Sequence, residues 1–157
     1  MSALEQFPRI TPFLWFNSNV EEAVNFYLAI FKNSRCLDEL RQDGKVMTIA
    51  FELDGQRFTG FNGGPMYKFT EAISLVVRCD SQEEVDYYWS RLVEGGKEIQ
   101  CGWLKDRFGL FWQIVPARLP DLLKNHEAMQ AMMQMKKLDI AELERAAAGV
   151  AGENFEV

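Results

Sequence analysis

The sequence is poor in the residue types that most often build metal and nucleophilic sites. Its 157 residues include one histidine, His126, and three cysteines, Cys36, Cys79 and Cys101, with no C-x-x-C spacing. An odd number of scattered cysteines does not indicate a disulfide framework, and reduced thiols are typical of cytoplasmic proteins. We therefore expect a cytoplasmic location, and we expect His126 to be a solvated or packed helix residue rather than a ligand.

Long apolar runs and clusters of basic residues are also missing. No stretch approaches the roughly 18 apolar residues of a membrane-spanning helix, and the N-terminus lacks the regions of a signal peptide. The net charge is −6, from 17 basic and 23 acidic residues, without a Lys/Arg-rich run. The sequence therefore indicates neither membrane insertion nor nucleic-acid binding.

A duplication organises the chain instead. Apolar residues make up 48 % of it, which is enough for a sizeable core. The segment 13–30 is echoed by the segment 75–92, so that Glu21 corresponds to Glu83 and Phe26 to Tyr88, each pair 62 positions apart. Two copies of one strand–helix unit are therefore expected.

Periodicity and turn residues predict the order β-α-β-β-β in each half. In the first half we expect strands over 10–16, 35–40, 46–53 and 56–61, with Asp-Gly hairpin turns at 43–44 and 54–55. A helix follows Asn17-Ser-Asn, which offers N-cap side chains. In the second half we expect strands over 72–79, 98–100, 101–105 and 110–115. The helix there lies between a capping box at 80–84 and Gly95-Gly96.

These elements predict an α+β fold with one domain over residues 1–157. It consists of two modules, 8–62 and 71–116, followed by a helical tail over 119–148. The connector Asn62-Gly-Gly-Pro lacks the Lys-Ser/Thr of a phosphate-binding loop, which favours a plain loop. The tail is rich in methionine, which is typical of an arm packed on its own domain or on a dimer partner.

A set of motifs in fixed order points to a known family. They are Glu22-Ala-Val-Asn-Phe-Tyr, Gly44-Lys-Val-Met, Phe61-Asn-Gly-Gly-Pro, Glu84-Val-Asp-Tyr-Tyr-Trp and Cys101-Gly-Trp-Leu-Lys-Asp-Arg-Phe-Gly. Over residues 8–145 the chain resembles the vicinal oxygen chelate (glyoxalase/bleomycin-resistance) superfamily. Within it, the chain is most similar to the PhnB-like branch, often labelled 3-demethylubiquinone-9 3-methyltransferase-like. The resemblance implies two modules that form a cupped, mixed-sheet half-barrel around a cavity.

Metal-using members of this superfamily hold a divalent ion at four inward strand positions, typically through His and Glu. The resemblance carries these positions onto Pro12, Thr59, Ser74 and Gln113. Proline offers no side-chain ligand, and the other three are neutral oxygen donors, whereas a transition metal favours imidazole, thiolate or carboxylate. We therefore expect no metal and no other cofactor.

Strand alternation extends these positions to a predicted pocket for a small molecule. Its candidate residues are Leu14, Phe16, Arg57, Thr59, Phe61, Ser74, Val76, Arg78, Phe111 and Gln113. Phe13 and Trp15 are then expected to pack under the helix. Arg57 and Arg78 either hold an anionic ligand or pair with Glu52 and Asp80.

Three functions remain open at this point. The first is a small-molecule-binding protein without the usual metal site, its ligand anionic or aromatic. The second is an enzyme of the superfamily, of isomerase, lyase or transferase type, with an atypical site and no catalytic residue that the sequence identifies. The third is a dimeric structural or interaction module. The resemblance also implies a homodimer, since this fold commonly pairs halves between chains. Cys101 has no nearby base and is more typical of a small buried residue than of a nucleophile. The chain also lacks a glycine-rich loop for S-adenosylmethionine, so methyltransferase activity is not expected.

Overall fold

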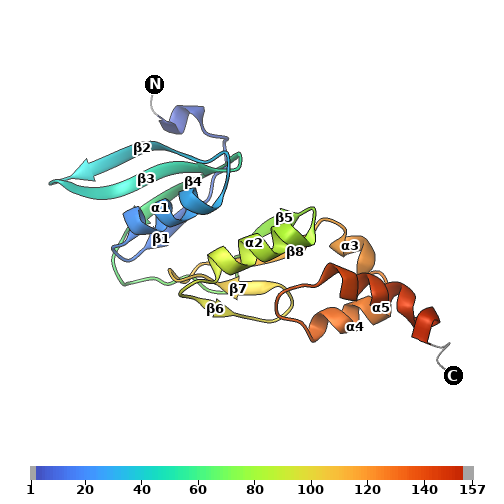
Figure 1. Ribbon diagram of the computed structural model, residues 1–157. Coiled ribbons are helices and arrows are strands. Elements are labelled where there is room, and N and C mark those ends of the chain that lie inside the picture. Colours follow the sequence, from blue (N-terminus) through green and yellow to red (C-terminus); the bar gives the residue numbers. More distant parts are fainter. Residues whose placement is uncertain (1–2, 154–157) are drawn as a thin grey trace. The chain divides into compact units, whose positions relative to one another are not determined.

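A computed structural model describes residues 3–153, with side chains described for residues 5–149. The chain divides into two compact units, of which the first ends at Phe69 and the second begins at Thr70. Each unit contains a mixed four-stranded sheet with a helix on one face, and helices follow the second sheet (Figure 1). Neither sheet closes into a barrel. The predicted α+β class is therefore confirmed.

The first unit follows the predicted order. Its elements are η1 (Ala3–Gln6), β1 (Phe13–Phe16), α1 (Val20–Ile30), β2 (Arg35–Gln42), β3 (Lys45–Leu53) and β4 (Gln56–Asn62). The strand order is β1-β4-β3-β2, with β1 parallel to β4 and the other pairs antiparallel. Both Asp-Gly turns have positive φ at both residues, as a tight hairpin between twisted strands requires.

Strand β2 forms one edge of the first sheet. Its pairing with β3 shifts register between Cys36 and Asp38 and again between Leu40 and Arg41. All but one of its eight side chains are exposed. Strand β1 forms the other edge, and it begins at Phe13 rather than at the predicted Ile10. Pro12 has no N–H to donate to a sheet, and Ile10 is 86 % exposed.

Helix α1 packs on the first sheet through an apolar face and is capped from a strand. A Cβ on Gly60 of β4 would lie 2.6 Å from Val20 Cγ2, so the helix fits only over glycine. Asn62 Oδ1 accepts a hydrogen bond from Val20 N at 2.9 Å, while its Nδ2 donates to the Val46 carbonyl at 3.2 Å. The N-cap residue Asn19 makes no side-chain capping bond. The sequence predicted that a side chain of residues 17–19 would cap α1. This prediction was wrong, because Asn62 supplies the capping oxygen instead.

The second unit repeats the first in shorter form. Its elements are β5 (Leu75–Cys79), α2 (Gln82–Leu92), β6 (Lys97–Glu98), β7 (Trp103–Lys105) and β8 (Phe111–Pro116), in the sheet order β5-β8-β7-β6. Helices α1 and α2 each have 11 residues and begin 62 positions apart, which confirms the duplication. Strands β6 and β7 are shorter than predicted, because Cys101 (φ 60°) and Gly102 (φ 84°) turn the chain between them.

Two sets of polar side-chain hydrogen bonds stabilise the second unit. The predicted capping box forms at α2, where Ser81 Oγ accepts from Glu84 N at 3.2 Å and Glu84 Oε1 accepts from Asp80 N at 2.6 Å. Asp106 is 2 % exposed and accepts hydrogen bonds from Leu110 N at 3.0 Å and from Trp112 Nε1 at 2.9 Å. Asp106 thus holds the turn before β8 with a buried carboxylate at its centre.

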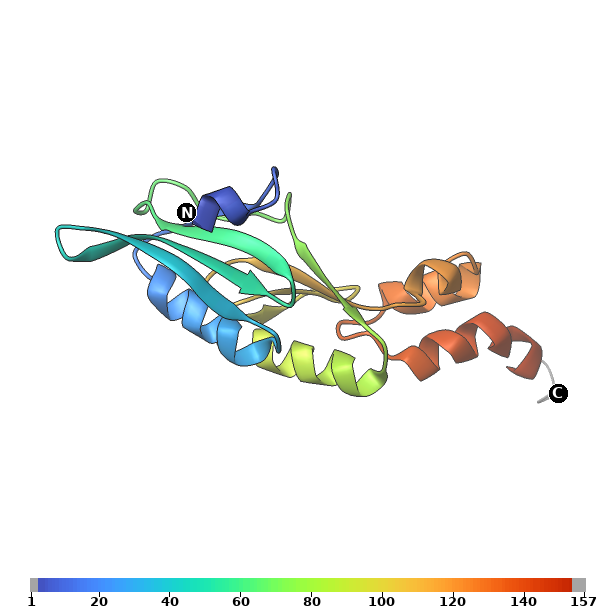
Figure 2. The ribbon, with the colours of Figure 1, turned by 90° about the horizontal axis from the view of Figure 1, so that it is seen from above.

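The tail forms α3 (Leu119–Leu122), α4 (His126–Met133) and α5 (Ile140–Glu153), of which α4 and α5 lie side by side (Figure 2). Leu122, Leu138 and Leu143 form a small core with Val115 of β8 packed against it. Cys101 N and Gly102 N donate to the carbonyls of Met135 and Lys136, both at 2.8 Å. The tail therefore packs on its own unit. No described helix is long and apolar enough to cross a membrane.

Candidate functional site

The face of the first sheet that lies opposite α1 carries an aromatic cluster. It consists of Phe13, Trp15, Phe61 and Tyr67. The ring of Trp15 lies 5.0 Å from that of Phe61 and 4.9 Å from that of Tyr67, edge to face in both pairs, and Phe13 lies 5.6 Å from Phe61. Phe13 is 60 % exposed and Tyr67 59 %, so the aromatic cluster offers a large apolar surface. Thr59 pairs with Phe13 in register and adds a hydroxyl to this face.

Two of the predicted pocket residues lie on the other face of β1. Leu14 and Phe16 are 7 % and 2 % exposed, and Leu14 pairs with Gly60, which faces α1. The prediction that they face the pocket was therefore wrong, as was the placement of Phe13 and Trp15 under the helix. The strand is apolar on both faces, so alternation alone did not decide between them.

Arg57 lies on the same face as Thr59 and Phe61, but its guanidinium is already engaged by other residues of this chain. Its Nε lies 3.3 Å from Glu52 Oε1, and its Nη1 donates to the Gln6 carbonyl at 3.1 Å. The guanidinium also sits 5.2 Å from the centre of the Phe7 ring. Three contacts already orient this guanidinium, which fits the expected alternative of pairing with Glu52.

The corresponding face of the second sheet is more polar. Gln113 Nε2 donates to Ser74 Oγ at 2.9 Å, and Val76, which pairs with Gln113, is 60 % exposed. Phe111 shares this face but is only 5 % exposed, and the Lys105 ammonium lies 5.8 Å from its ring centre. The sequence placed these four residues on one face, and the strand register agrees.

Arg78 is exposed at the end of β5. Its Nε lies 3.5 Å from Asp80 Oδ1, and the two side chains are 72 % and 65 % exposed. An ion pair of such exposure contributes little to stability, since water screens it. As for Arg57, the local acid named from the sequence is the partner.

The four metal positions of the superfamily fall into two adjacent pairs. Thr59 N donates to the Pro12 carbonyl at 3.1 Å, and Ser74 and Gln113 share the side-chain bond described above. The two positions assigned to each module are therefore neighbours in the structure. Their chemistry does not fit a divalent transition metal, because the set contains no imidazole, thiolate or carboxylate. Among the described residues, no three His, Cys, Asp or Glu side chains gather into a metal-binding group.

Two of the three thiols, those of Cys79 and Cys36, lack the properties of a nucleophile. Cys79 is 1 % exposed, and desolvation, followed by the charges of Glu84 and Asp80, raises its pKa to about 12. Cys36 is exposed, yet partial burial and the nearby Glu39 raise its pKa as well. A reactive cysteine needs a lowered pKa, so neither has that property.

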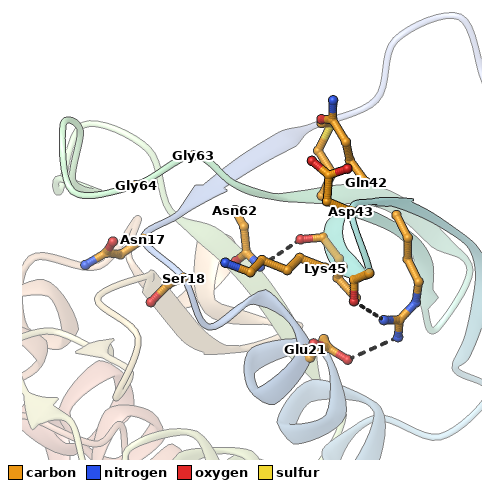
Figure 3. A pocket seen from close by; sticks show the side chains of 13 residues that line it. Asn17, Ser18, Glu21, Gln42, Asp43, Lys45, Asn62, Gly63 and Gly64 are labelled. Carbon is orange, nitrogen blue, oxygen red and sulfur yellow. Dashed lines mark hydrogen bonds and ion pairs between the residues drawn. The ribbon is translucent and has the colours of Figure 1, made fainter.

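A separate polar pocket of about 740 Å³ opens beside the N-terminus of α1, between the β1–α1 loop and the β2–β3 hairpin (Figure 3). Arg41 closes it on one side, pairing with Glu21 at 3.6 Å. The Lys45 side chain extends across it toward Asn62 (Figure 3). Gly63 N and Gly64 N donate to the carbonyls of Phe16 and Asn17 at 2.9 and 2.8 Å, so this loop does not offer these N–H groups to a phosphate. No sequence signal marked this pocket, since it joins residues far apart in the chain.

The family is shown by comparison with known sequences. The sequence model of the family described as 3-demethylubiquinone-9 3-methyltransferase matches residues 8–115. The chain belongs to this family. With it, the chain belongs to the vicinal oxygen chelate superfamily, as the motifs indicated. The matched region of this 3-demethylubiquinone-9 3-methyltransferase family ends at β8, so the tail from Leu119 lies outside it.

Solved structures agree with this assignment. A Bacillus cereus protein described as a 3-demethylubiquinone-9 3-methyltransferase, PhnB protein, is 32 % identical, with a TM-score of 0.66 over 70 % of this chain and 100 % of its own. A Pseudomonas aeruginosa protein is 21 % identical (TM-score 0.58; 70 % and 98 % covered). A fosfomycin resistance protein from Listeria monocytogenes, in complex with Mn(II) and sulfate, is 17 % identical (TM-score 0.58; 74 % and 97 % covered) and shares the fold. No curated protein matches the chain.

Proposed function

We propose that the chain is a small-molecule-binding protein that uses the superfamily fold without its usual metal. The observation that carries this proposal is the exposed aromatic cluster on the open face of the first sheet. A flat ligand placed against Phe13 and Phe61 gains edge-to-face or offset-stacked contacts, and Thr59 supplies a hydrogen bond. The proposed ligand is therefore aromatic, with one or two polar groups.

The surroundings of the aromatic cluster favour a neutral ligand over an anionic one. Arg57, a cation on this face, is paired with Glu52 and sits over Phe7. A ligand carboxylate would have to compete with Glu52 for it. Methyltransferase chemistry receives no support, since the chain has no glycine-rich loop for S-adenosylmethionine.

Titration with a matched pair of aromatic probes tests the proposal. We expect 1-naphthol to bind at least as well as 1-naphthoate, with Phe13→Ala and Phe61→Ala each weakening 1-naphthol about 3- to 10-fold, since an aromatic pair contributes about 0.5–1.5 kcal/mol. Tyr87→Ala, which removes a partly exposed ring of α2, serves as the control and should change nothing. Equal weakening by all three variants would contradict the proposal. Preference for naphthoate that is lost in Arg57→Ala would replace it with an anion site.

A second candidate function is that of a homodimeric interaction module. It rests on two exposed apolar side chains of the second unit: Val76, 60 % exposed, lies on the edge strand β5, and Ile73, 71 % exposed, lies just before that strand. Sedimentation over a range of concentrations tests it. Val76→Glu should shift a dimer toward monomer if this surface is the interface, whereas an unchanged mass would remove this candidate.

A further inference from the structure

A second cavity lies where the tail meets the end of the second sheet. It is a crevice of about 570 Å³ between the β5–α2 corner, the end of β8 and the beginning of α5. Its apolar lining comes from Cys79, Pro116, Ala117, Ile140 and Ala141. Ala117 and Ala141 are small, which leaves space between the walls. The crevice is built jointly by the family core and by a tail that the family match does not include.

The width of the crevice is fixed by hydrogen bonds from one side chain. Gln82, at the start of α2, donates from Nε2 to the Leu138 carbonyl at 3.0 Å and accepts at Oε1 from Ile140 N at 2.8 Å. These bonds tie the N-terminus of α5 to that of α2. Ala117 N donates to the Cys79 carbonyl at 2.8 Å, which joins two more residues of the lining. A preformed cavity binds without the cost of ordering its walls.

The rim of the crevice is charged but balanced. Arg118, the N-cap residue of α3, pairs with Glu144 of α5, and both residues line the crevice. The carboxylate of Asp80, also in the lining, pairs with Arg78. Each acid therefore has its own cation, and the burial of Cys79 keeps its thiol neutral. A charged ligand therefore meets no unpaired acid among the lining residues and no lining cation without a partner, whereas an uncharged ligand needs neither.

From this combination of apolar lining, fixed walls and balanced rim, we propose that the crevice is a binding site for a small uncharged apolar molecule of the aliphatic alcohol or ketone class. Its volume lies within the roughly 300–1,000 Å³ typical of ligand pockets. The site is independent of the aromatic cluster. It gives the tail a function, which is to form one wall of this pocket.

Three probes of equal length and different charge test the proposal: hexan-1-ol, hexanoate and hexylammonium. Methyl NMR of Ala117, Ile140 and Ala141 reports binding in the crevice directly. We expect saturable shifts with hexan-1-ol and about tenfold weaker binding of both charged probes, since burying an unpaired charge is unfavourable. In Glu144→Gln, which frees Arg118, hexanoate should bind more tightly while hexan-1-ol stays unchanged.

A filling variant and a matched control complete the test. Ala141→Trp should abolish the hexan-1-ol shifts, whereas Ala148→Trp, at an exposed position of the same helix outside the crevice, should preserve them. Absence of saturable shifts, or shifts that survive in Ala141→Trp, would overturn the proposal. Phe13→Ala distinguishes this site from the aromatic cluster. The variant removes a ring of the aromatic cluster and should leave the crevice shifts unchanged.

Discussion

The three cysteines have different surroundings although the sequence presents them alike. Cys36 is exposed on the edge strand β2, Cys79 is buried at the end of β5, and Cys101 is half-buried in a turn. The sequence indicated free thiols, but it could not rank their accessibility. That ranking depends on which side of a strand faces a helix.

These differences predict the order and pH dependence of thiol reactions. With iodoacetamide at pH 8, Cys36 should be modified first and Cys79 last, as measured by mass spectrometry of peptides. The pKa of Cys79, raised from 9.0 to about 12, means that the folded state holds its proton more tightly than the unfolded state. Its contribution to the free energy of unfolding is therefore complete below pH 9 and is lost between pH 9 and about 12.

Cys79→Ala provides the control for this prediction. The variant should lose the part of the alkaline destabilisation that comes from this thiol, and the difference from the parent should narrow as the pH rises above 9. If Cys79 in the folded protein reacted with iodoacetamide as fast as Cys36, the predicted order of thiol modification would be wrong.

The ion-pair partners of two arginines could be predicted from the sequence. The partners named for Arg57 and Arg78, Glu52 and Asp80, are the ones observed, because each acid lies on a neighbouring strand position or two residues away. The contacts of Arg57 with Gln6 and Phe7 were not foreseen. They depend on the path of the chain before β1, where the sequence has no periodic pattern.

At the scale of elements, the two related helices begin with different caps. Helix α2 begins with a local capping box, whereas α1 is capped by Asn62 from the last strand of its sheet. A sequence pattern shows the first kind of cap and not the second. A local pattern also failed for β1. Its residues are apolar on both faces, so the sequence did not show which face packs against α1, and the two faces were exchanged in the prediction.

The cap on α1 predicts an unequal effect of two asparagine substitutions. Asn62→Ala removes the bond to Val20 N and the bond to the Val46 carbonyl, and we expect the free energy of unfolding to fall by about 1–3 kcal/mol. Asn19→Ala, at the nominal N-cap, removes no side-chain capping bond and should change it by less than about 0.5 kcal/mol. Urea denaturation measures both. An equal loss in the two variants would show that Asn19 is the cap in solution.

At the scale of the molecule, the duplication and its family followed from the sequence, and the arrangement of the tail did not. The match to two related modules rests on motifs of fixed spacing. The tail is fixed to the second unit by contacts that no spacing rule contains: two backbone bonds at Cys101 and Gly102, the bridge from Gln82, and an ion pair between Lys137 and Asp86 at 2.8 Å.

The ion pair at the tail predicts a pH dependence. Hydrogen bonds from Lys137 and then Gln82 lower the pKa of Asp86 below its ordinary 3.8. The folded state thus favours the carboxylate, so this contribution to stability is present above pH 3.8 and is lost as the pH falls through the lowered value. Both side chains are partly exposed, which limits the effect to about 0.2–1 kcal/mol.

Asp86→Asn should therefore reduce the free energy of unfolding at pH 7 by that amount and should flatten its acid dependence below pH 4. Asp121→Asn is the matched control, because its partner Lys124 lies three residues away within the tail, so this ion pair does not connect the tail to the second sheet or to α2. Equal losses in the two variants, measured by urea denaturation at pH 7 and pH 3, would show that docking of the tail does not depend on Asp86.

Strand β2 has a further consequence for how copies of this chain meet one another. An exposed edge strand of eight residues would ordinarily recruit another strand and begin polymerisation from sheet to sheet. Here two register shifts bend the edge, and the charged residues Arg35, Asp38, Glu39 and Arg41 occupy it. Both features oppose the addition of a strand. We therefore expect this edge to resist the self-association of the chain at high concentration, and we expect any assembly to form through its faces or its other edges.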